Sequence, residues 1–100
     1  MNIKIENEGS AIVARLSGRL DTAAAAEIAP DVQALAEQAA GRIILDCTEL
    51  AYISSSGLRL FLTLRKESAA KSGKLQVRNI NADIRQVFMM TGFISLFEII

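Results

Sequence analysis

The stretch of sequence that decides the fold is Ile43–Leu58, which reads IILDCTELAYISSSGL. Its apolar start is typical of a strand inside a sheet that helices cover, and three serines and a glycine then open a second apolar segment that predicts a helix. The N-terminus of a helix exposes unpaired N–H groups and the positive end of the helix dipole. A phosphoryl group on Ser55 or Ser56 would therefore meet several hydrogen-bond donors. The arrangement favours a switch over a catalyst.

On the N-terminal side of this stretch, the hydrophobic periodicity predicts two strands and a helix. The strands Ile3–Ile5 and Ile12–Leu16 suit a hairpin across residues 7–10. The chain then turns at residues 18–22, and apolar residues from 25 to 39 follow helical spacing. Pro30 either kinks this helix or sits in the first turn of a helix that begins near Ala29.

On the C-terminal side, strands and helices continue to alternate. The expected elements are a central strand over 42–46, a helix over 56–72, a strand over 74–78, a third helix that Asn81 caps and Gly92 ends, and a last strand over 97–100. The order is β-β-α-β-α-β-α-β. It predicts a single α/β domain over residues 1–100, a mixed sheet of about four or five strands packed with about three helices.

Composition excludes several classes of function. Eleven Lys and Arg residues balance eleven Asp and Glu residues, so the positive field that non-specific nucleic-acid binding requires is lacking. No apolar run approaches the ~20 residues that span a bilayer, and the N-terminus lacks the pattern of a secretory signal. We expect a cytoplasmic protein that binds neither DNA nor RNA and does not insert into membranes.

The residue inventory also argues against an enzyme. The chain has no histidine and a single cysteine, Cys47, so a Cys/His metal site, an internal disulfide and a histidine-based triad cannot be assembled. Cys47 follows an apolar strand, where a small core residue is the better interpretation than a nucleophile. We therefore expect no catalytic residues, no metal and no cofactor.

Three motifs carry a resemblance that extends across essentially the whole chain. Residues 16–21 (LSGRLD), 43–46 (IILD) with 53–58 (ISSSGL), and 90–93 (MTGF) resemble the anti-sigma factor antagonists of the STAS domain family. The resemblance implies partner switching. The unmodified domain binds an anti-sigma factor that is also a serine kinase and so frees a sigma factor, phosphorylation releases the domain, and a phosphatase restores binding.

The same resemblance assigns the site. The family's phosphoacceptor falls on Ser55, with Ser56 as the runner-up. The residue that is ordinarily acidic before the acceptor is Ser54 in this chain. The expected partner-binding residues are Asp21, Ser54, Ser55, Ser56 and Gly57, which lie in the motifs, and Arg59, which lies one turn after the serines. The alternative within the same fold is an unphosphorylated accessory subunit that docks on the ATPase of a membrane transporter.

Other interpretations of these residues compete with the functional one. The serines suit simple capping of a helix N-terminus, a role compatible with phosphorylation because one serine can cap while another accepts phosphate. Leu60, Leu64, Met89 and Met90 suit core filling better than a binding surface. The basic residues of the second helix suit solubility, and Arg59 is the one best placed to meet a partner or a phosphate.

Overall fold

The computed structural model describes all 100 residues as one five-stranded sheet with three helices. The elements are β1 (Asn2–Glu8), β2 (Ala11–Leu20), α1 (Thr22–Glu37), β3 (Arg42–Ile53), α2 (Ser55–Ala70), β4 (Lys74–Arg78), α3 (Ala82–Thr91), a short 3-10 turn (Phe93–Ser95) and β5 (Glu98–Ile99). This order confirms the predicted alternation of strands and helices.

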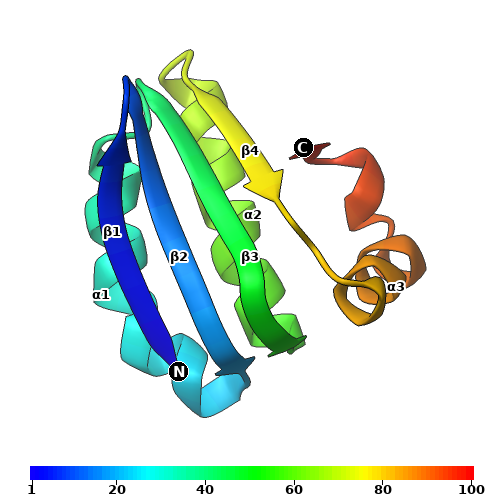
Figure 1. Cartoon of the computed structure of the whole chain (residues 1–100). Coiled ribbons are helices and arrows are strands. Elements are labelled where there is room, and N and C mark those ends of the chain that lie inside the picture. Colours follow the sequence, from blue (N-terminus) through cyan, green and yellow to red (C-terminus); the bar gives the residue numbers. More distant parts are fainter.

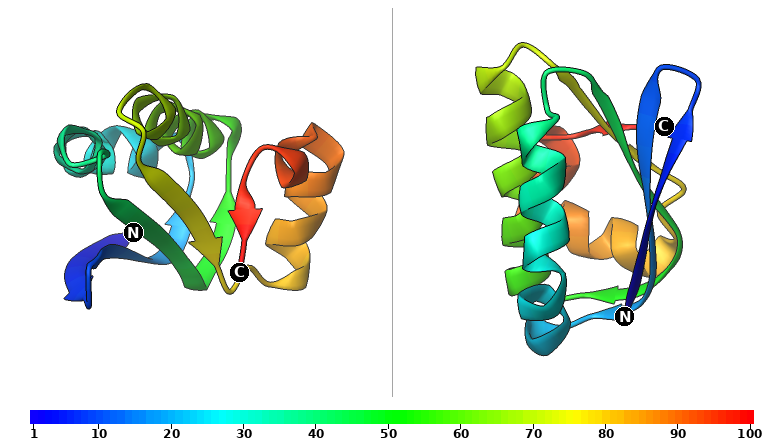
Figure 2. Two further views of the ribbon diagram at one scale, coloured as in Figure 1. Left: turned by 90° about the horizontal axis from the view of Figure 1, so that it is seen from above. Right: turned by 90° about the vertical axis from the view of Figure 1, so that its left-hand side faces the viewer.

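The sheet has the spatial order β1-β2-β3-β4-β5, which confirms β3 as the central strand. β1 runs antiparallel to β2, and every other neighbouring pair is parallel. Helices α1 and α2 lie side by side on one face of the sheet, whereas α3 lies beside the C-terminal part of β3, past the end of β4 (Figures 1 and 2). No helix is long and apolar enough to cross a membrane.

The main core lies between the sheet and the two helices α1 and α2. Its fully buried side chains include Leu20, Leu35, Ile43, Leu45 and Leu64. Four phenylalanines extend this core toward the C-terminus, with ring centroids 5.9–6.4 Å apart, and so attach α3 and the last turn to α2. At about 25 cal/mol per Å² of apolar surface, such burial is the main stabilising term of the fold.

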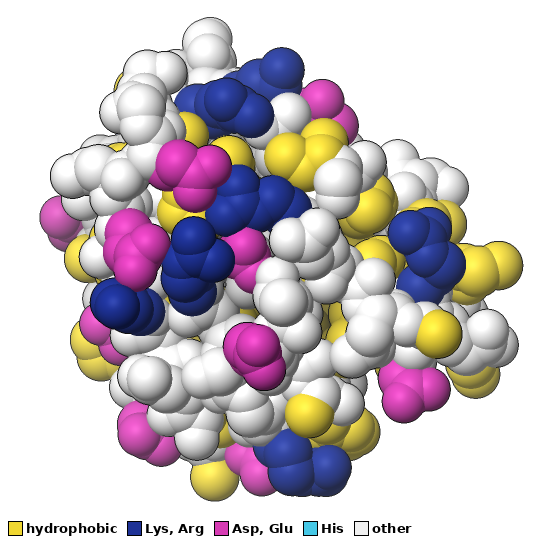
Figure 3. Space-filling view, in the orientation of Figure 1, with side chains coloured by type: hydrophobic (Ala, Val, Ile, Leu, Met, Phe, Trp, Pro, Cys, Tyr) yellow, Lys and Arg dark blue, Asp and Glu magenta, His cyan; other side chains and the backbone are white.

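The face of the sheet opposite α1 and α2 is covered by charged side chains instead of a helix (Figure 3). The Asp46 carboxylate lies at its centre, 4% exposed, 3.3 Å from Arg15 and 2.9 Å from Arg78. The two arginines also pair with Glu6 and Glu8 on β1. This network joins β1, β2, β3 and β4 over the small buried cluster of Ala11, Val13 and Ile44.

Several predicted boundaries are wrong. β3 has 12 residues and continues to Ile53, well beyond the predicted end at Asp46. Irregularities in its register with β2, between Arg15 and Ser17 and between Gly18 and Arg19, break the alternation of buried and exposed residues in the second half of β3, where the continuous apolar run has ended. For the same reason β2 continues through the predicted turn at Gly18 to Leu20.

The first helix begins at Thr22 and runs through Pro30, so a start near Ala29 is wrong. Asp21 sets the start, because its side chain caps the helix. Pro30 is exposed, and its missing hydrogen bond lies on the solvent side of the helix. At the other end of the chain, core filling is confirmed for Leu64 but wrong for Met89 and Met90, which are 58% and 77% exposed.

Candidate functional site

The serine turn lies where two neighbouring parallel strands end. Leu20, the last residue of β2, pairs with Ile53, the last residue of β3. The Ser54 N–H donates to the Leu20 carbonyl at 2.8 Å, so the β2–α1 and β3–α2 turns are joined directly. Each turn opens a helix, and both helix N-termini therefore lie at the same edge of the sheet. Two positive helix ends at one edge favour the binding of an anion.

Ser54 caps α2. Its backbone is extended, with φ −91° and ψ 173°, and its Oγ accepts a hydrogen bond from the Gly57 N–H at 3.3 Å. The Ser54 carbonyl accepts the first helical bond, from the Leu58 N–H at 2.9 Å. The capping interpretation is therefore confirmed for Ser54.

Ser55 and Ser56 occupy the first turn of α2 and differ in exposure. Ser55 is exposed, whereas Ser56 is half-buried. The Ser54 and Gly57 N–H groups already have acceptors, so the donors left over at this end are the N–H groups of Ser55 and Ser56. A phosphate on Ser55 would lie beside these free donors while remaining accessible to an enzyme.

Gly57 allows α2 to begin close against the sheet. It is buried, and a Cβ atom built at this position would lie 2.7 Å from Leu20 Cγ and 2.9 Å from Ile53 Cγ1. Any side chain would push the start of the helix away from β2 and β3. The structure therefore shows a packing role for Gly57, and its predicted contact with a partner stays a prediction.

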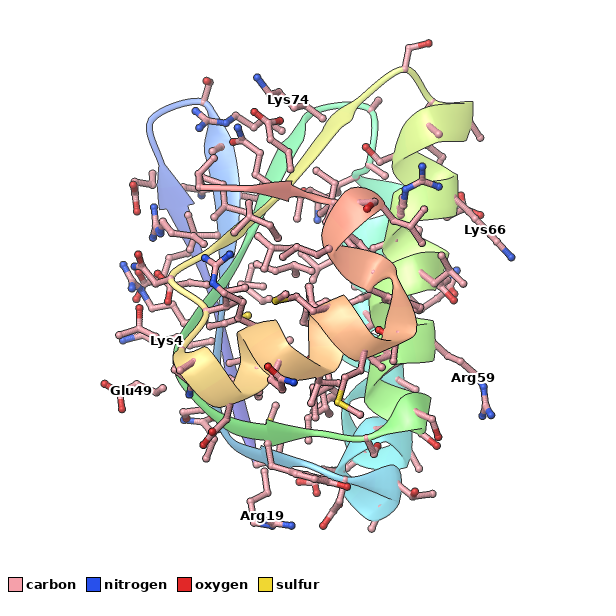
Figure 4. The ribbon with its side chains drawn as sticks, turned by 90° about the vertical axis from the view of Figure 1, so that its right-hand side faces the viewer. Lys4, Arg19, Glu49, Arg59, Lys66 and Lys74 are labelled. Atoms are coloured by element: carbon pink, nitrogen blue, oxygen red, sulfur yellow. The ribbon has the colours of Figure 1, made fainter.

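Asp21 and Arg59, both predicted partner-binding residues, lie on either side of the serine turn. The Asp21 carboxylate accepts a hydrogen bond from the Ala24 N–H at 2.9 Å and so caps α1, as Ser54 caps α2. Arg59 lies in the first turns of α2 and points away from the molecule into solvent (Figure 4). The structure thus brings the six predicted residues to one edge, with Ser55 and Arg59 its most exposed members.

Two further residues lie at this edge and were not predicted from the sequence, Arg19 and Tyr52. They are register partners at the ends of β2 and β3, both are exposed, and the Arg19 guanidinium carbon lies 4.3 Å from the centroid of the Tyr52 ring. The spacing could have identified them, because Arg19 stands two residues before the cap Asp21 and Tyr52 stands two residues before the cap Ser54. With the strands paired in parallel, these matched positions lie side by side.

Unpaired positive charge is present on both sides of the serine turn. Four of the eleven basic residues make neither an ion pair nor a hydrogen bond through their side chains: Arg19, Arg59, Lys66 and Arg85. Two of these four, Arg19 and Arg59, flank the serine turn. The electrostatic character of this edge is therefore positive before any modification.

Two other features of the molecule lie apart from the serine turn. A hollow of about 250 Å³ on the open face of the sheet is lined by Lys4, Arg15, Asp46 and Glu49, among others. Lys4 and Glu49 project away from α2 (Figure 4). Cys47 is buried, and burial raises the pKa of its thiol to about 12, so it is un-ionised at neutral pH and suits a core residue.

The chain belongs to the STAS domain family, whose match covers residues 2–100 and so confirms the resemblance. One relative is BtrV of Bordetella bronchiseptica (strain ATCC BAA-588 / NCTC 13252 / RB50), which is named as a candidate anti-sigma factor antagonist. It is 29% identical to this chain over 99 residues, and the match covers 99% of this chain and 85% of that protein.

Two solved structures of SpoIIAA agree with this assignment. The unphosphorylated anti-sigma factor antagonist SpoIIAA matches 99% of this chain and 87% of its own with a TM-score of 0.75 and 26% identity. The phosphorylated form of the Bacillus cell fate determinant SpoIIAA matches 99% of this chain and 91% of its own with a TM-score of 0.74 and 27% identity. The general role that these relatives share is that of an anti-sigma factor antagonist.

Proposed function

We propose that this protein is an anti-sigma factor antagonist that works by partner switching. In its unphosphorylated state it binds an anti-sigma factor with serine kinase activity and frees a sigma factor. Phosphorylation of Ser55 releases the antagonist, and a phosphatase resets it. The observation that carries the proposal is the exposed Ser55 in the first turn of α2, beside two free N–H donors and next to a cap already supplied by Ser54.

The energetics of the modification support a switch. Phosphorylation adds about −1.5 to −2 charges and three acceptor oxygens at one side chain. The helix N-terminus accommodates that charge inside the domain, whereas a partner surface packed over Ser55 would have to desolvate it. If that desolvation costs about 3 to 4 kcal/mol, the affinity falls roughly a hundred- to a thousandfold. A change of this size exchanges partners without unfolding the domain.

Exposure supports Ser55 over Ser56 as the acceptor. A kinase must bring the hydroxyl oxygen to the γ-phosphate of ATP in line, which requires an accessible side chain. Ser55 is exposed and Ser56 is half-buried. That SpoIIAA is known in unphosphorylated and phosphorylated forms further supports a reversible modification on this fold.

The test begins with the protein purified from its native cells together with its partners. Mass spectrometry identifies the bound proteins and locates phosphate on the serine turn. The recovered kinase is then purified and incubated with ATP and either the wild-type chain, the Ser55→Ala variant or the matched Ser56→Ala variant. We expect Ser55→Ala to abolish phosphate incorporation and to retain binding. We expect Ser56→Ala to retain both phosphate incorporation and binding, and Ser55→Asp to weaken binding.

Two results would contradict the proposal. Full phosphate incorporation into Ser55→Ala would move the acceptor to Ser56 or away from the turn. Recovery of a transporter ATPase with unmodified serines, and of no kinase, would replace partner switching with the role of an accessory subunit.

A further inference from the structure

We propose that Arg19 and Tyr52 form an anchor through which this protein selects its partner, and that they dock on an acidic patch of the kinase surface. The inference rests on the proposed function and adds to it the chemistry of the partner's contact surface. It starts from two exposed residues that face each other across β2 and β3, next to the serine turn.

The pair lies at the strand ends that lead into the serine turn, so a partner that covers Ser55 and extends over these strand ends would meet it. Arg19 precedes Leu20, and Tyr52 precedes Ile53, so each stands directly before the residue that packs under Gly57. Leu20 and Ile53 are buried, and their neighbours Arg19 and Tyr52 are exposed at the same edge. Figure 4 shows Arg19 extending from the end of the sheet where α1 and α2 begin.

The chemistry of the pair suits a binding anchor. The guanidinium of Arg19 stacks over the Tyr52 ring at 4.3 Å from its centroid, which holds a long side chain in one orientation and leaves its N–H groups free for a carboxylate. Pre-ordering a side chain in this way lowers the entropy cost of binding. Arginine and tyrosine are also among the residues that carry most of the energy of protein interfaces.

The charges around the pair specify an acidic partner. Arg19 and Arg59 make no ion pair, and the N-termini of α1 and α2 add positive partial charge at the same edge. The carboxylate nearest in sequence, Asp21, is engaged as the cap of α1. Glu49, also exposed on β3, projects sideways from the open face of the sheet, whereas Arg19 extends from the end of the sheet (Figure 4).

Phosphorylation would reverse this charge. At the serine turn, the positive charges of Arg19 and Arg59 are balanced in part by the carboxylate of Asp21. A phosphate of about −1.5 to −2 on Ser55 outweighs the one positive charge that is left, and the edge becomes negative. An acidic patch on the partner that is attracted to the unmodified edge is repelled by the modified one. Arg19 thus attracts the acidic patch of the partner, and phosphate on Ser55 repels the same patch.

The test measures the affinity of the purified kinase, identified as above, for a set of variants. We expect Arg19→Glu to weaken binding at least about thirtyfold, the size of a hot-spot effect, and Tyr52→Ala to weaken it at least about fivefold. The matched control is Lys66→Glu, which makes the same change of charge at another exposed and unpaired residue farther along α2 (Figure 4). We expect Lys66→Glu to change the affinity by less than about threefold.

Two further measurements separate an anchor from a structural role. The far-ultraviolet circular dichroism and thermal midpoint of Arg19→Glu should match those of the wild type. The wild-type affinity should fall as salt is raised, and that salt dependence should be smaller or reversed in Arg19→Glu. Tyr52→Phe, which keeps the ring, should bind like the wild type.

The outcomes distinguish this inference from the proposed function. If the kinase binds and phosphorylates Ser55, and Arg19→Glu binds as tightly as Lys66→Glu, the anchor is refuted and partner switching stands. If Arg19→Glu binds more tightly than the wild type, the partner's contact surface is basic and the inference is overturned. If no kinase binds the wild-type chain, the proposed function fails and the anchor fails with it.

Discussion

At the scale of single residues, Gly57 matters to both the fold and the site, because the absence of a Cβ lets α2 begin close against β2 and β3. We expect Gly57→Ala to lower the free energy of unfolding by about 1–3 kcal/mol, because its Cβ would lie 2.7 Å from Leu20 Cγ. Gly41→Ala is the control, since a Cβ there meets only the Gln38 carbonyl, at 3.8 Å. Urea denaturation of both variants checks the expectation, and equal losses of stability would contradict it.

Asp46 predicts how stability responds to acid. Burial raises the pKa of this carboxyl, but hydrogen bonds from Thr48 and Arg78 outweigh that effect and leave its pKa below the ordinary value of 3.8. A carboxyl whose pKa is lower in the folded than in the unfolded state stabilises the fold above the unfolded pKa. That stabilisation is lost as pH falls through the lower, folded pKa.

We therefore expect the free energy of unfolding to fall below about pH 4, and to fall less steeply in the Asp46→Asn variant. Hydrogen bonds and charges from Arg15 and Arg78 also lower the pKa of Glu6 and Glu8, so part of the acid dependence should remain in the variant. Urea denaturation from about pH 6 to about pH 2 measures both curves. Parallel curves would show that Asp46 does not contribute.

At the scale of the element, the start of α2 separates the roles of the three serines. We expect Ser54→Ala to cost about 1 kcal/mol, because the Gly57 N–H then loses its acceptor. Ser55→Ala and Ser56→Ala should each stay within about 0.5 kcal/mol of the wild type, since neither hydroxyl caps the helix. Ser54→Asp keeps a capping oxygen and should retain the wild-type stability. A larger loss from Ser55→Ala than from Ser54→Ala, measured in urea, would assign the cap to Ser55.

Sequence periodicity predicted the elements better than their ends. Strong caps made α3 predictable at both ends, because Asn81 accepts from the Ile84 N–H and Gly92 adopts a φ of 79° that favours glycine. The end of β3 was not predictable, since Leu50 and Ile53 are buried three residues apart, out of step with a regular strand. That spacing depends on the register with β2, which local sequence does not contain.

Only part of the site was predictable, because local sequence does not contain the strand register. The serine turn carries local signals, so its position at the start of α2 followed from the sequence. Arg19 and Tyr52 lie 33 positions apart, and only the pairing of β2 with β3 brings them together. Contacts of this kind require knowledge of the topology.

At the scale of the whole molecule, the site is built on a rigid frame. The Ser54 N–H donates to the Leu20 carbonyl, Gly57 packs on both strands, and β2 and β3 are fixed on the open face by the ion pairs of Asp46. We expect the phosphorylated protein to keep the same fold, with a thermal midpoint within a few degrees of the unmodified one. Nothing at the serine turn needs to move to receive the phosphate.

Nuclear magnetic resonance of backbone amides checks this expectation. Shifts on phosphorylation should be confined to the β2–α1 and β3–α2 turns and the first turns of α1 and α2. Shifts that extend to the phenylalanine cluster between α2 and α3 would show a rearrangement, and the switch would then be conformational instead of a change of surface charge.

The pairing of Arg19 with Tyr52 at the strand ends has a consequence for how several related domains in one cell could each bind a different partner. Neither side chain belongs to the buried core of the domain. A duplicated copy of this domain can therefore exchange the residues at these two positions without loss of folding. If Arg19 and Tyr52 select the partner as proposed, gene duplicates would acquire separate partners by substitutions at these two positions, while the serine turn is inherited unchanged.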